Sequence, residues 1–318
     1  MPATPPAGVG VDVGGTKMLA VGLDGDGGVV AEHRTPTPTE AGEFLDAIGE
    51  AVAAVCAPDG EPAAIGVGVP GLVDQAGVLQ FSPHLPSLNG LYLEEALRKR
   101  WPGAAVWVGN DATAAVWGEH VAGAARGSSD VLMVTLGTGI GGGIVLGGRL
   151  VEGRHRYAGE LGHMVVDPHG PPCPCGGQGC WERYASGSGL GQLGREAALS
   201  GRAPGVVTRA GGDPEAVRGE HVTVAAAEGD PDARLIMVRF AWWLALGLAN
   251  LANLLDPGAI VIGGGVVEAG EILMEPLREA FLELVEAPAL REVSILPAQL
   301  GAAAGAVGAG LLARQPRL

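Results

Sequence analysis

The chain has 318 residues, of which 47% are hydrophobic and 17% charged, a composition typical of a folded protein larger than one compact core. Its 35 acidic and 20 basic residues give a net charge of -15, which disfavours a surface that follows nucleic-acid backbones or anionic membranes. Residues 1–8 lack the charged region of a secretion signal, so we expect a cytoplasmic protein with two lobes or domains.

The first part of the chain alternates strands and helices. Three apolar segments separated by glycine turns predict an antiparallel meander over residues 9–34. Apolar spacing then predicts further elements in chain order. They are a helix over 44–55, a strand over 64–69, a helix over 91–100, a strand over 105–108, and a helix that starts at Asn110 or Asp111 and runs through His120.

From Asp130 the pattern begins again, with a strand over 131–136, a glycine-rich turn and a strand over 144–146. Two halves that each begin with strand, glycine turn and strand indicate duplication of one α/β arrangement. The later expected elements are a helix over 232–255, a strand over 259–262, a helix over 271–286, a strand over 293–296 and a small-residue tail helix that returns to the first domain.

We predict a small α/β domain over residues 1–115 with a C-terminal helix in 300–318, and a large α/β domain over 116–299 with a zinc-binding insertion. The most apolar stretch, residues 240–255, contains two asparagines and is too short to span a bilayer comfortably. It therefore predicts a buried helix rather than a membrane span.

Two glycine turns between expected strands are candidate phosphate sites. In the first, Asp12 to Lys17, the backbone of Gly14 and Gly15 could turn towards a phosphate, and Asp12 could hold magnesium through water. An ordinary Gly-Gly hairpin is the alternative interpretation. The second, Leu136 to Gly143, formally matches G-x-G-x-x-G, but a strand follows it instead of the helix of a dinucleotide-binding fold. Because the dipeptide Gly-Lys never occurs, a P-loop is excluded, and a phosphate-cradling turn is the preferred interpretation.

A carboxylate follows a strand and opens a helix at Gly109-Asn110-Asp111-Ala112. A helix N-terminus favours the charged form of an aspartate, which suits a base that must accept a hydroxyl proton. A plain N-cap is the alternative for Asp111.

The most specific motif is a cluster of metal-binding side chains between two glutamates. One imidazole and three thiolates fit a closed tetrahedral zinc site, whereas a disulfide between Cys175 and Cys180 is disfavoured without a secretion signal. A closed site has no open coordination position, so we predict a structural zinc that fixes the two glutamates as hydrogen-bond acceptors. The residues are Glu160, His163, Cys173, Cys175, Cys180 and Glu182.

Together these motifs resemble the ROK family of sugar kinases, and within it the ATP-dependent bacterial glucokinases. The resemblance covers nearly the whole chain, and its most specific part is the run from Gly162 to Glu182. It implies an actin-like or ribonuclease-H-like fold with two α/β domains and a central cleft. It also implies ATP-dependent phosphorylation of glucose at the 6-hydroxyl, with Mg²⁺ and a structural Zn²⁺.

The resemblance assigns roles residue by residue. Asp111 matches the catalytic aspartate, and His163 would both bind zinc and touch the sugar. The positions that match sugar contacts are Gly71, Asn89, Asn110, Asp111, Glu160, His163 and Glu182. The positions that match the nucleotide and magnesium side are Asp12, Gly14, Gly15, Thr16, Lys17, Gly137, Thr138, Gly139, Gly263, Gly264 and Gly265.

Two departures from the family pattern concern the choice of sugar. The segment 153–158 carries bulky residues where the family has small ones, and Asn89 lacks a neighbouring tryptophan. A kinase for N-acetylglucosamine, mannose, fructose or allose therefore stays an alternative. A polyphosphate-dependent glucokinase is less favoured because such relatives lack the cysteine-rich insertion.

Non-enzymatic alternatives are a zinc-bound scaffold and a sugar-responsive regulator. Only eleven residues precede Asp12, which leaves no room there for a helix-turn-helix region and argues against a DNA-binding regulator. We expect a small-molecule sugar and ATP as partners, neither nucleic acid nor membrane, and a homodimer or homotetramer.

Overall fold

The computed structural model describes residues 6–56 and 60–316 and has mixed α/β structure. The chain forms two compact units. The N-terminal unit contains the described residues of Met1–Met133, Gly143–Gly159 and Ala298–Leu318, and the C-terminal unit contains Val134–Gly142 and Glu160–Pro297. The domain boundaries given above stay a prediction. The segment 1–8, judged free of a secretion signal, has its first five residues outside the described residues.

A five-stranded sheet of order β3-β2-β1-β4-β8 lies in the N-terminal unit. β1 runs antiparallel to β2 and parallel to β4, and β2 runs antiparallel to β3, so the predicted meander is confirmed. The strands are β1 (Gly8–Val13), β2 (Lys17–Leu23), β3 (Val29–Pro36), β4 (Ala64–Val69) and β8 (Ala105–Asn110).

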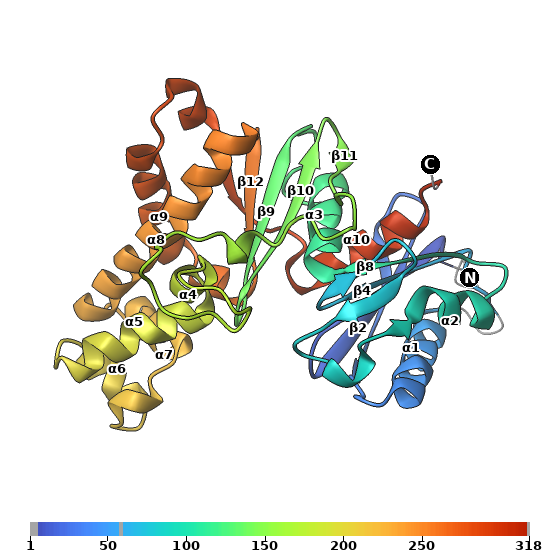
Figure 1. Ribbon diagram of the computed structural model, residues 1–318, viewed down its shortest axis with the longest axis horizontal. Coiled ribbons are helices and arrows are strands. Elements are labelled where there is room, and N and C mark those ends of the chain that lie inside the picture. Colours follow the sequence, from blue (N-terminus) through green and yellow to red (C-terminus); the bar gives the residue numbers. More distant parts are fainter. Residues whose placement is uncertain (1–5, 57–59, 317–318) are drawn as a thin grey trace. The chain divides into compact units, whose positions relative to one another are not determined.

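Different residue types cover the two faces of this sheet, because successive side chains of a strand point to opposite sides. Val11 joins the hydrophobic core that includes Phe44 of α1. Gly10 and Gly66 face the other side, where a Cβ atom at either position would overlap the backbone of α10. Figure 1 shows α1 and α10 beside this sheet. The helices of this unit are α1 (Ala41–Val55), α2 (Leu93–Arg100), α3 (Asp111–Val121) and α10 (Ala304–Ala313).

A separate three-stranded sheet follows β4, with β5 (Leu72–Val73), β6 (Val78–Phe81) and β7 (Leu91–Tyr92). The helix expected over residues 91–100 therefore begins only at Leu93. Its first two residues are a strand because Leu91 and Tyr92 pair with β6, a long-range contact that outweighs helical spacing.

The second five-stranded sheet has the order β11-β10-β9-β12-β13. Counted in chain order, both sheets arrange their strands as third, second, first, fourth and fifth, which confirms the predicted duplication. The strands are β9 (Val131–Leu136), β10 (Ile140–Leu146), β11 (Arg149–Leu150), β12 (Ala259–Gly263) and β13 (Ser294–Pro297).

The strand expected from residue 144 begins earlier, at Ile140, so the glycines at 141–143 lie in a strand and not in a turn. Gly143 shows why a glycine is needed in this strand. A Cβ atom there would overlap Val116 and the carbonyl oxygen of Ala112 in α3, and glycine in a strand commonly marks such a close approach.

The helices of the C-terminal unit include α8, which by length and composition is the one described helix able to cross a membrane. Its buried residues include Phe240 and Leu244, and it packs against α7 and α9, so the predicted buried helix is confirmed. The helices are α4 (Glu182–Ala185), α5 (Gly187–Leu199), α6 (Pro204–Arg209), α7 (Gly219–Ala227), α8 (Pro231–Leu255) and α9 (Glu271–Leu284). Single 3₁₀ turns are η1 (Pro86–Leu88), η2 (Leu161–His163), η3 (Pro214–Ala216), η4 (Gly265–Ala269), η5 (Pro288–Glu292) and η6 (Gly301–Ala303).

Candidate functional site

Asp111 is the first residue of α3, directly after β8. The N-cap is its neighbour Asn110, whose Oδ1 accepts a hydrogen bond of 2.9 Å from the backbone N–H of Thr113. The Asp111 Oδ1 accepts a 2.8 Å hydrogen bond from the N–H of Ala112. Since Asn110 performs the capping, the interpretation of Asp111 as a plain N-cap is wrong, and its carboxylate lies in the first helical turn.

Asp12, near the end of β1, lies close enough to Asp111 for their charges to interact. Burial raises the pKa of Asp12 to about 8, and the negative charge of Asp111 adds to this shift. The strand pairing explains the approach, because Asp12 pairs with Gly68 of β4 and Gly68 pairs with Gly109 of β8. The carboxyl ends of these parallel strands meet at one sheet edge. Two neighbouring carboxylates are oxygen ligands of the kind that Mg²⁺ prefers, and the cation would relieve their repulsion.

The turn from Gly14 to Lys17 is a closed hairpin whose Gly14 N–H donates to the Lys17 carbonyl at 2.9 Å. Thr37 holds it in place: the Thr37 hydroxyl donates to Gly14 O at 2.9 Å, and its N–H donates to Thr16 O at 3.0 Å. Gly15, Thr16 and Lys17 are exposed. The hairpin geometry is thus clear, and the role of this turn in phosphate binding stays a prediction.

Two predicted sugar contacts, Asn89 and Asn110, are hydrogen-bonded to the hairpin formed by β5 and β6. The Asn89 Oδ1 accepts from the N–H of buried Ser82 at 2.8 Å. The Asn110 Nδ2 donates to the carbonyl of Gly71 at 3.2 Å. Gly71 has φ 143, and a Cβ atom would overlap Phe81 O, so only glycine fits at this bend.

The predicted zinc ligands come together in the C-terminal unit. The donor atoms of His163, Cys173, Cys175 and Cys180 all lie within 4.8 Å of one another. All three cysteines are free thiols, with 3.6 Å between the sulfurs of Cys175 and Cys180. This donor set fits a tetrahedral Zn²⁺ site.

The two nitrogens of His163 face different partners. Nδ1 lies 3.8 Å from the Cys173 sulfur, whereas Nε2 lies 3.7 Å from the Glu160 Oε2. One nitrogen can therefore bind a metal while the other meets a carboxylate, an arrangement that commonly orients metal-binding histidines. Burial raises the pKa of Glu160; His163 opposes this shift and Glu182 adds to it.

Glu182, the first residue of α4, connects the cysteine cluster with the glycine turn after β9. Its Oε1 lies 3.2 Å from the Cys173 sulfur and 3.7 Å from Nδ1 of His163. Its Oε2 accepts from the Ile140 N–H at 3.4 Å. A Cβ atom at Gly139 would lie 2.6 Å from the same oxygen. The structure thus brings Glu160, His163 and Glu182 together with the Gly137–Gly139 turn.

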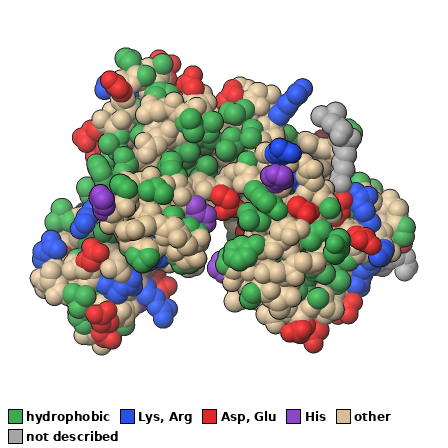
Figure 2. Space-filling model, in the orientation of Figure 1, with side chains coloured by type: hydrophobic (Ala, Val, Ile, Leu, Met, Phe, Trp, Pro, Cys, Tyr) green, Lys and Arg blue, Asp and Glu red, His purple; other side chains and the backbone are tan. Residues whose placement is uncertain are grey.

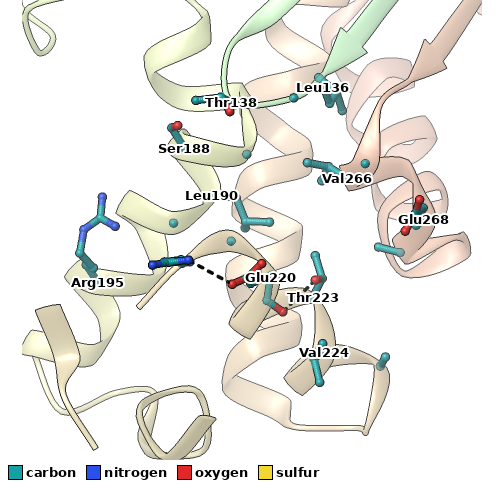
Figure 3. A pocket seen from close by; sticks show the side chains of 18 residues that line it. Leu136, Thr138, Ser188, Leu190, Arg195, Glu220, Thr223, Val224, Val266 and Glu268 are labelled. Atoms are coloured by element: carbon teal, nitrogen blue, oxygen red, sulfur yellow. Dashed lines mark hydrogen bonds and ion pairs between the residues drawn. The ribbon is translucent and has the colours of Figure 1, made fainter. Parts of the chain in front are cut away.

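A cavity of about 810 Å³ opens beside this turn, within the C-terminal unit. Figure 3 shows Leu136 and Thr138 at one end and Arg195, Glu220 and Val224 at the other. Basic side chains gather over the α5–α7 region of this unit in Figure 2 (lower left). The lining residues are Leu136, Gly137, Thr138, Gly187, Ser188, Leu190, Gly191, Arg195, Arg218, Gly219, Glu220, Thr223, Val224, Ala227, Gly265, Val266, Glu268 and Ala269.

Six residues of two glycine turns, 137–139 and 263–265, were predicted to bind the nucleotide. Gly137, Thr138 and Gly265 line the cavity, whereas Gly139, Gly263 and Gly264 do not. Gly264 has φ 84, and a Cβ atom there would lie about 2.5 Å from the Leu136 backbone, which gives it a packing role. A Cβ atom at Gly265 would meet nothing within 4 Å. Because the glycines that line the cavity have no side chains, a phosphate-bearing ligand could approach their backbone closely.

Comparison with known proteins identifies the family. The model of the ROK family matches residues 8–316. The chain belongs to the ROK family. It is 38% identical over 315 residues to a glucokinase of Streptomyces coelicolor, covering 97% of this chain and 98% of that protein. It is also 33% identical over 320 residues to an N-acetylmannosamine kinase of Shigella boydii, with 97% and 98% covered.

Among solved structures, the chain is similar to a ROK family glucokinase of Streptomyces griseus in complex with glucose and AMPPNP. The TM-score is 0.84 at 39% identity, and the match covers 98% of this chain and 100% of that one. The expectation of an actin-like or ribonuclease-H-like ROK fold is therefore confirmed.

The cavity of this ROK family member contains residues that the sequence analysis missed. Arg195 lies on α5, Glu220 on α7 and Glu268 in η4, and no local motif joins these segments. One signal was available: Ser186-Gly187-Ser188-Gly189 opens α5, where Ser186 is the N-cap and the Gly187 N–H donates to Gly137 O at 2.8 Å.

Proposed function

We propose that this ROK family member transfers the γ-phosphoryl group of ATP to the 6-hydroxyl of glucose. The observation that carries the proposal is the likeness, over 98% of the chain, to a glucokinase structure that contains glucose and AMPPNP. The two carboxylates Asp12 and Asp111, the large cavity beside Gly137 and the carboxylates at the cysteine cluster support the same reaction.

In this reaction Asp111 is the general base. Its carboxylate accepts the proton of the 6-hydroxyl while that oxygen attacks the γ-phosphorus of ATP; the new O–P bond forms as the bond to the ADP oxygen breaks. The helix N-terminus favours the charged carboxylate before the reaction. Asn110, fixed by Thr113 and Gly71, and Asn89, fixed by Ser82, bind sugar hydroxyls.

Asp12 would hold Mg²⁺ through water, and the bound ion would neutralise charge on the phosphate oxygens. The cavity takes the nucleoside part of ATP, and Gly137 and Thr138, which line it, lie beside the phosphates. His163, Cys173, Cys175 and Cys180 would hold a structural Zn²⁺ that fixes Glu182 and, through His163, Glu160 as acceptors for the sugar.

The test is the rate of ADP formation by purified protein with Mg-ATP and a panel of hexoses. Glucose should give the highest kcat/KM, and Asp111→Asn should lower kcat by about a hundredfold or more while glucose binding is kept. Asp230→Asn is the matched control, because Asp230 is the N-cap of α8 and Asn is an equally good cap. Near-normal turnover in Asp111→Asn would reject the assigned base.

The same panel separates the alternatives. The 33% identity to an N-acetylmannosamine kinase favours N-acetylated hexosamines as the second candidate substrates. Turnover on such a sugar alone would keep the mechanism and change the substrate. Turnover with polyphosphate in place of ATP would change the donor, and silence with every sugar and donor would reject the kinase function.

We further propose a cytoplasmic homodimer or homotetramer. Exposed apolar side chains on α8 support the assembly: Leu235, Val238 and Trp242 are 68%, 52% and 39% exposed, and their spacing places them on one helix face. Light scattering coupled to gel filtration tests it. Leu235→Glu should lower the measured mass, and a monomeric wild-type protein would overturn the proposal.

A further inference from the structure

The residues that precede Glu160 form a segment fixed to the N-terminal unit. We call residues 151–159 the strap. It belongs to the N-terminal unit, and Glu160 is the next residue in the chain. It includes the bulky residues 154–157, and none of the functions assigned above uses them.

Arg156 is the main anchor of the strap. Its guanidinium donates from Nε to Glu152 Oε1 at 2.8 Å and lies 2.7 Å from the same oxygen through Nη2. Nη1 donates to the carbonyl of Asp74 at 3.4 Å, and the group lies 5.6 Å from the ring centre of Trp107. The side chain is only 12% exposed. A planar guanidinium can serve all three partners at once, which a lysine ammonium cannot.

The backbone of the strap is strained at the same residue. Arg156 has φ 66, a left-handed conformation that costs free energy for a residue with a side chain. Such a conformation persists where surrounding contacts hold it. A second contact lies beside it, since the Gln75 Nε2 donates to the Arg154 carbonyl at 2.7 Å.

The strap docks on the turn between β5 and β6, which contains Asp74 and Gln75. This hairpin also carries the partners of two proposed sugar contacts: Gly71, at the start of β5, accepts from Asn110, and Ser82, after β6, donates to Asn89. Arg156 therefore connects two parts of the N-terminal unit. One is the strap, which directly precedes Glu160 in the chain, and the other is the β5–β6 hairpin, which orients Asn89 and Asn110.

We propose that Arg156 is a positioning residue for the sugar site, which it serves by holding the strap on the β5–β6 turn. The inference rests on the proposed function, because it needs Glu160 to bind the sugar. In this role Arg156 does not contact the sugar; it holds the strap, whose last residue directly precedes Glu160 in the chain, on the hairpin of its own unit. Loss of the anchor should weaken sugar binding and leave ATP binding unchanged.

The experiment compares Arg156→Ala, Arg156→Lys and Arg98→Ala. Arg98 is a matched control in the same unit: its Nε donates to Glu94 Oε1, four residues earlier, at 3.0 Å, and its Nη2 donates to Val106 O at 3.4 Å. Arg156→Ala should raise the KM for glucose about tenfold, with KM for ATP and kcat within about twofold of wild type. Arg156→Lys should recover only part of the loss, and Arg98→Ala should change neither KM.

A double variant tests whether Arg156 acts through Glu160. In the Glu160→Gln background, Arg156→Ala should have a much smaller effect on the KM for glucose, since the positioned carboxylate is already lost. Equal effects in both backgrounds, or a KM for glucose in Arg156→Ala no higher than in Arg98→Ala, would overturn the proposal.

Hydrogen exchange gives a readout that needs no turnover. Arg156→Ala should speed exchange at Ala158, whose N–H donates to Glu152 O at 3.0 Å, and Arg98→Ala should not. Faster exchange with an unchanged KM for glucose would make the anchor purely structural and overturn the positioning role. Absence of sugar turnover and sugar binding in the wild type would instead reject the kinase function, and the positioning role with it.

Discussion

The sulfur of Cys173 lies 3.2 Å from the Oε1 of Glu182. A proposed zinc ligand thus touches a carboxylate that is itself proposed to bind the sugar. The proposed metal site and the proposed sugar site would therefore be in direct contact, and removal of the metal should change the binding of the sugar.

Loss of the zinc should weaken glucose binding more than ATP binding. Cys180→Ser removes one of four ligands, so we expect the bound metal to fall well below about one zinc per chain and the KM for glucose to rise about tenfold. Elemental analysis and initial rates measure both. Cys56→Ser is the control, because Cys56 lies outside the cluster. A fully active Cys180→Ser protein without metal would contradict the proposed link.

Gly305 should be needed beside Asp12. A Cβ atom at Gly305 would lie 2.7 Å from Cγ of Asp12, so Gly305→Ala should lower the free energy of unfolding by about 1–3 kcal/mol and raise the Mg²⁺ concentration that gives half-maximal activity. Gly42→Ala in α1 is the matched control, since a Cβ atom there meets nothing within 4 Å; it should be neutral or stabilising by up to about 1 kcal/mol. Thermal melts and Mg²⁺ titrations test both variants, and equal behaviour of the two would contradict the prediction.

The raised pKa of Asp12, about 8 against an ordinary 3.8, sets a pH dependence of stability in the absence of Mg²⁺. Between these values the folded protein keeps a proton that the unfolded chain loses, so the contribution of Asp12 to the free energy of unfolding is full below pH 3.8 and is lost as pH rises towards 8. The Asp12→Asn variant has no carboxyl group at this position and therefore does not lose this stability as the pH rises. Its Tm relative to wild type should therefore be higher at pH 8 than at pH 5, whereas its Mg²⁺-dependent activity should fall.

Asp26→Asn, at an exposed turn position, is the control for this measurement. Its melting curves should follow the pH dependence of the wild type. A difference in Tm between Asp12→Asn and wild type that stays constant from pH 5 to pH 8 would show that Asp12 is ionised across this range.

Filling the cavity should weaken ATP binding selectively. Val224 on α7 lines the cavity and is 49% exposed, so Val224→Trp should raise the KM for ATP about tenfold while the KM for glucose stays within about twofold. Leu199→Trp, on α5 and outside the lining residues, is the control with 59% exposure. Unchanged KM for ATP in Val224→Trp would remove the cavity from the nucleotide site.

Motifs contained in a short stretch of sequence were predictable. The zinc ligands Cys173, Cys175 and Cys180 lie within eight residues, and ligand chemistry alone restricts what such a cluster can do. Most strands of the two five-stranded sheets were also readable from apolar segments and glycine turns, whereas β5, β6, β7 and β11 were not predicted. Asp111 could be placed at a helix start, although the sequence did not decide between Asp111 and Asn110 as the cap.

Long-range contacts were not predictable. Asp12 approaches Asp111 only because β1, β4 and β8 pair in parallel, which no local pattern specifies. The strand β7 exists because Leu91 pairs with β6. The cavity joins α5, α7 and η4, whose residues are up to about 80 positions apart in the chain and share no motif.

One face of the sheet in the N-terminal unit, which contains Gly10 and Gly66, is covered by α10, and this has a consequence for synthesis of the protein on the ribosome. Gly10 of β1 and Gly66 of β4 lie against α10, whose residues 304–313 are synthesised long after these two strands. Until then one face of the first sheet lacks its natural cover and is open to chaperones or to aggregation. The sheet therefore stays incomplete until α10 has been made, and loss of α10 would leave the sheet face that contains Gly10 and Gly66 uncovered.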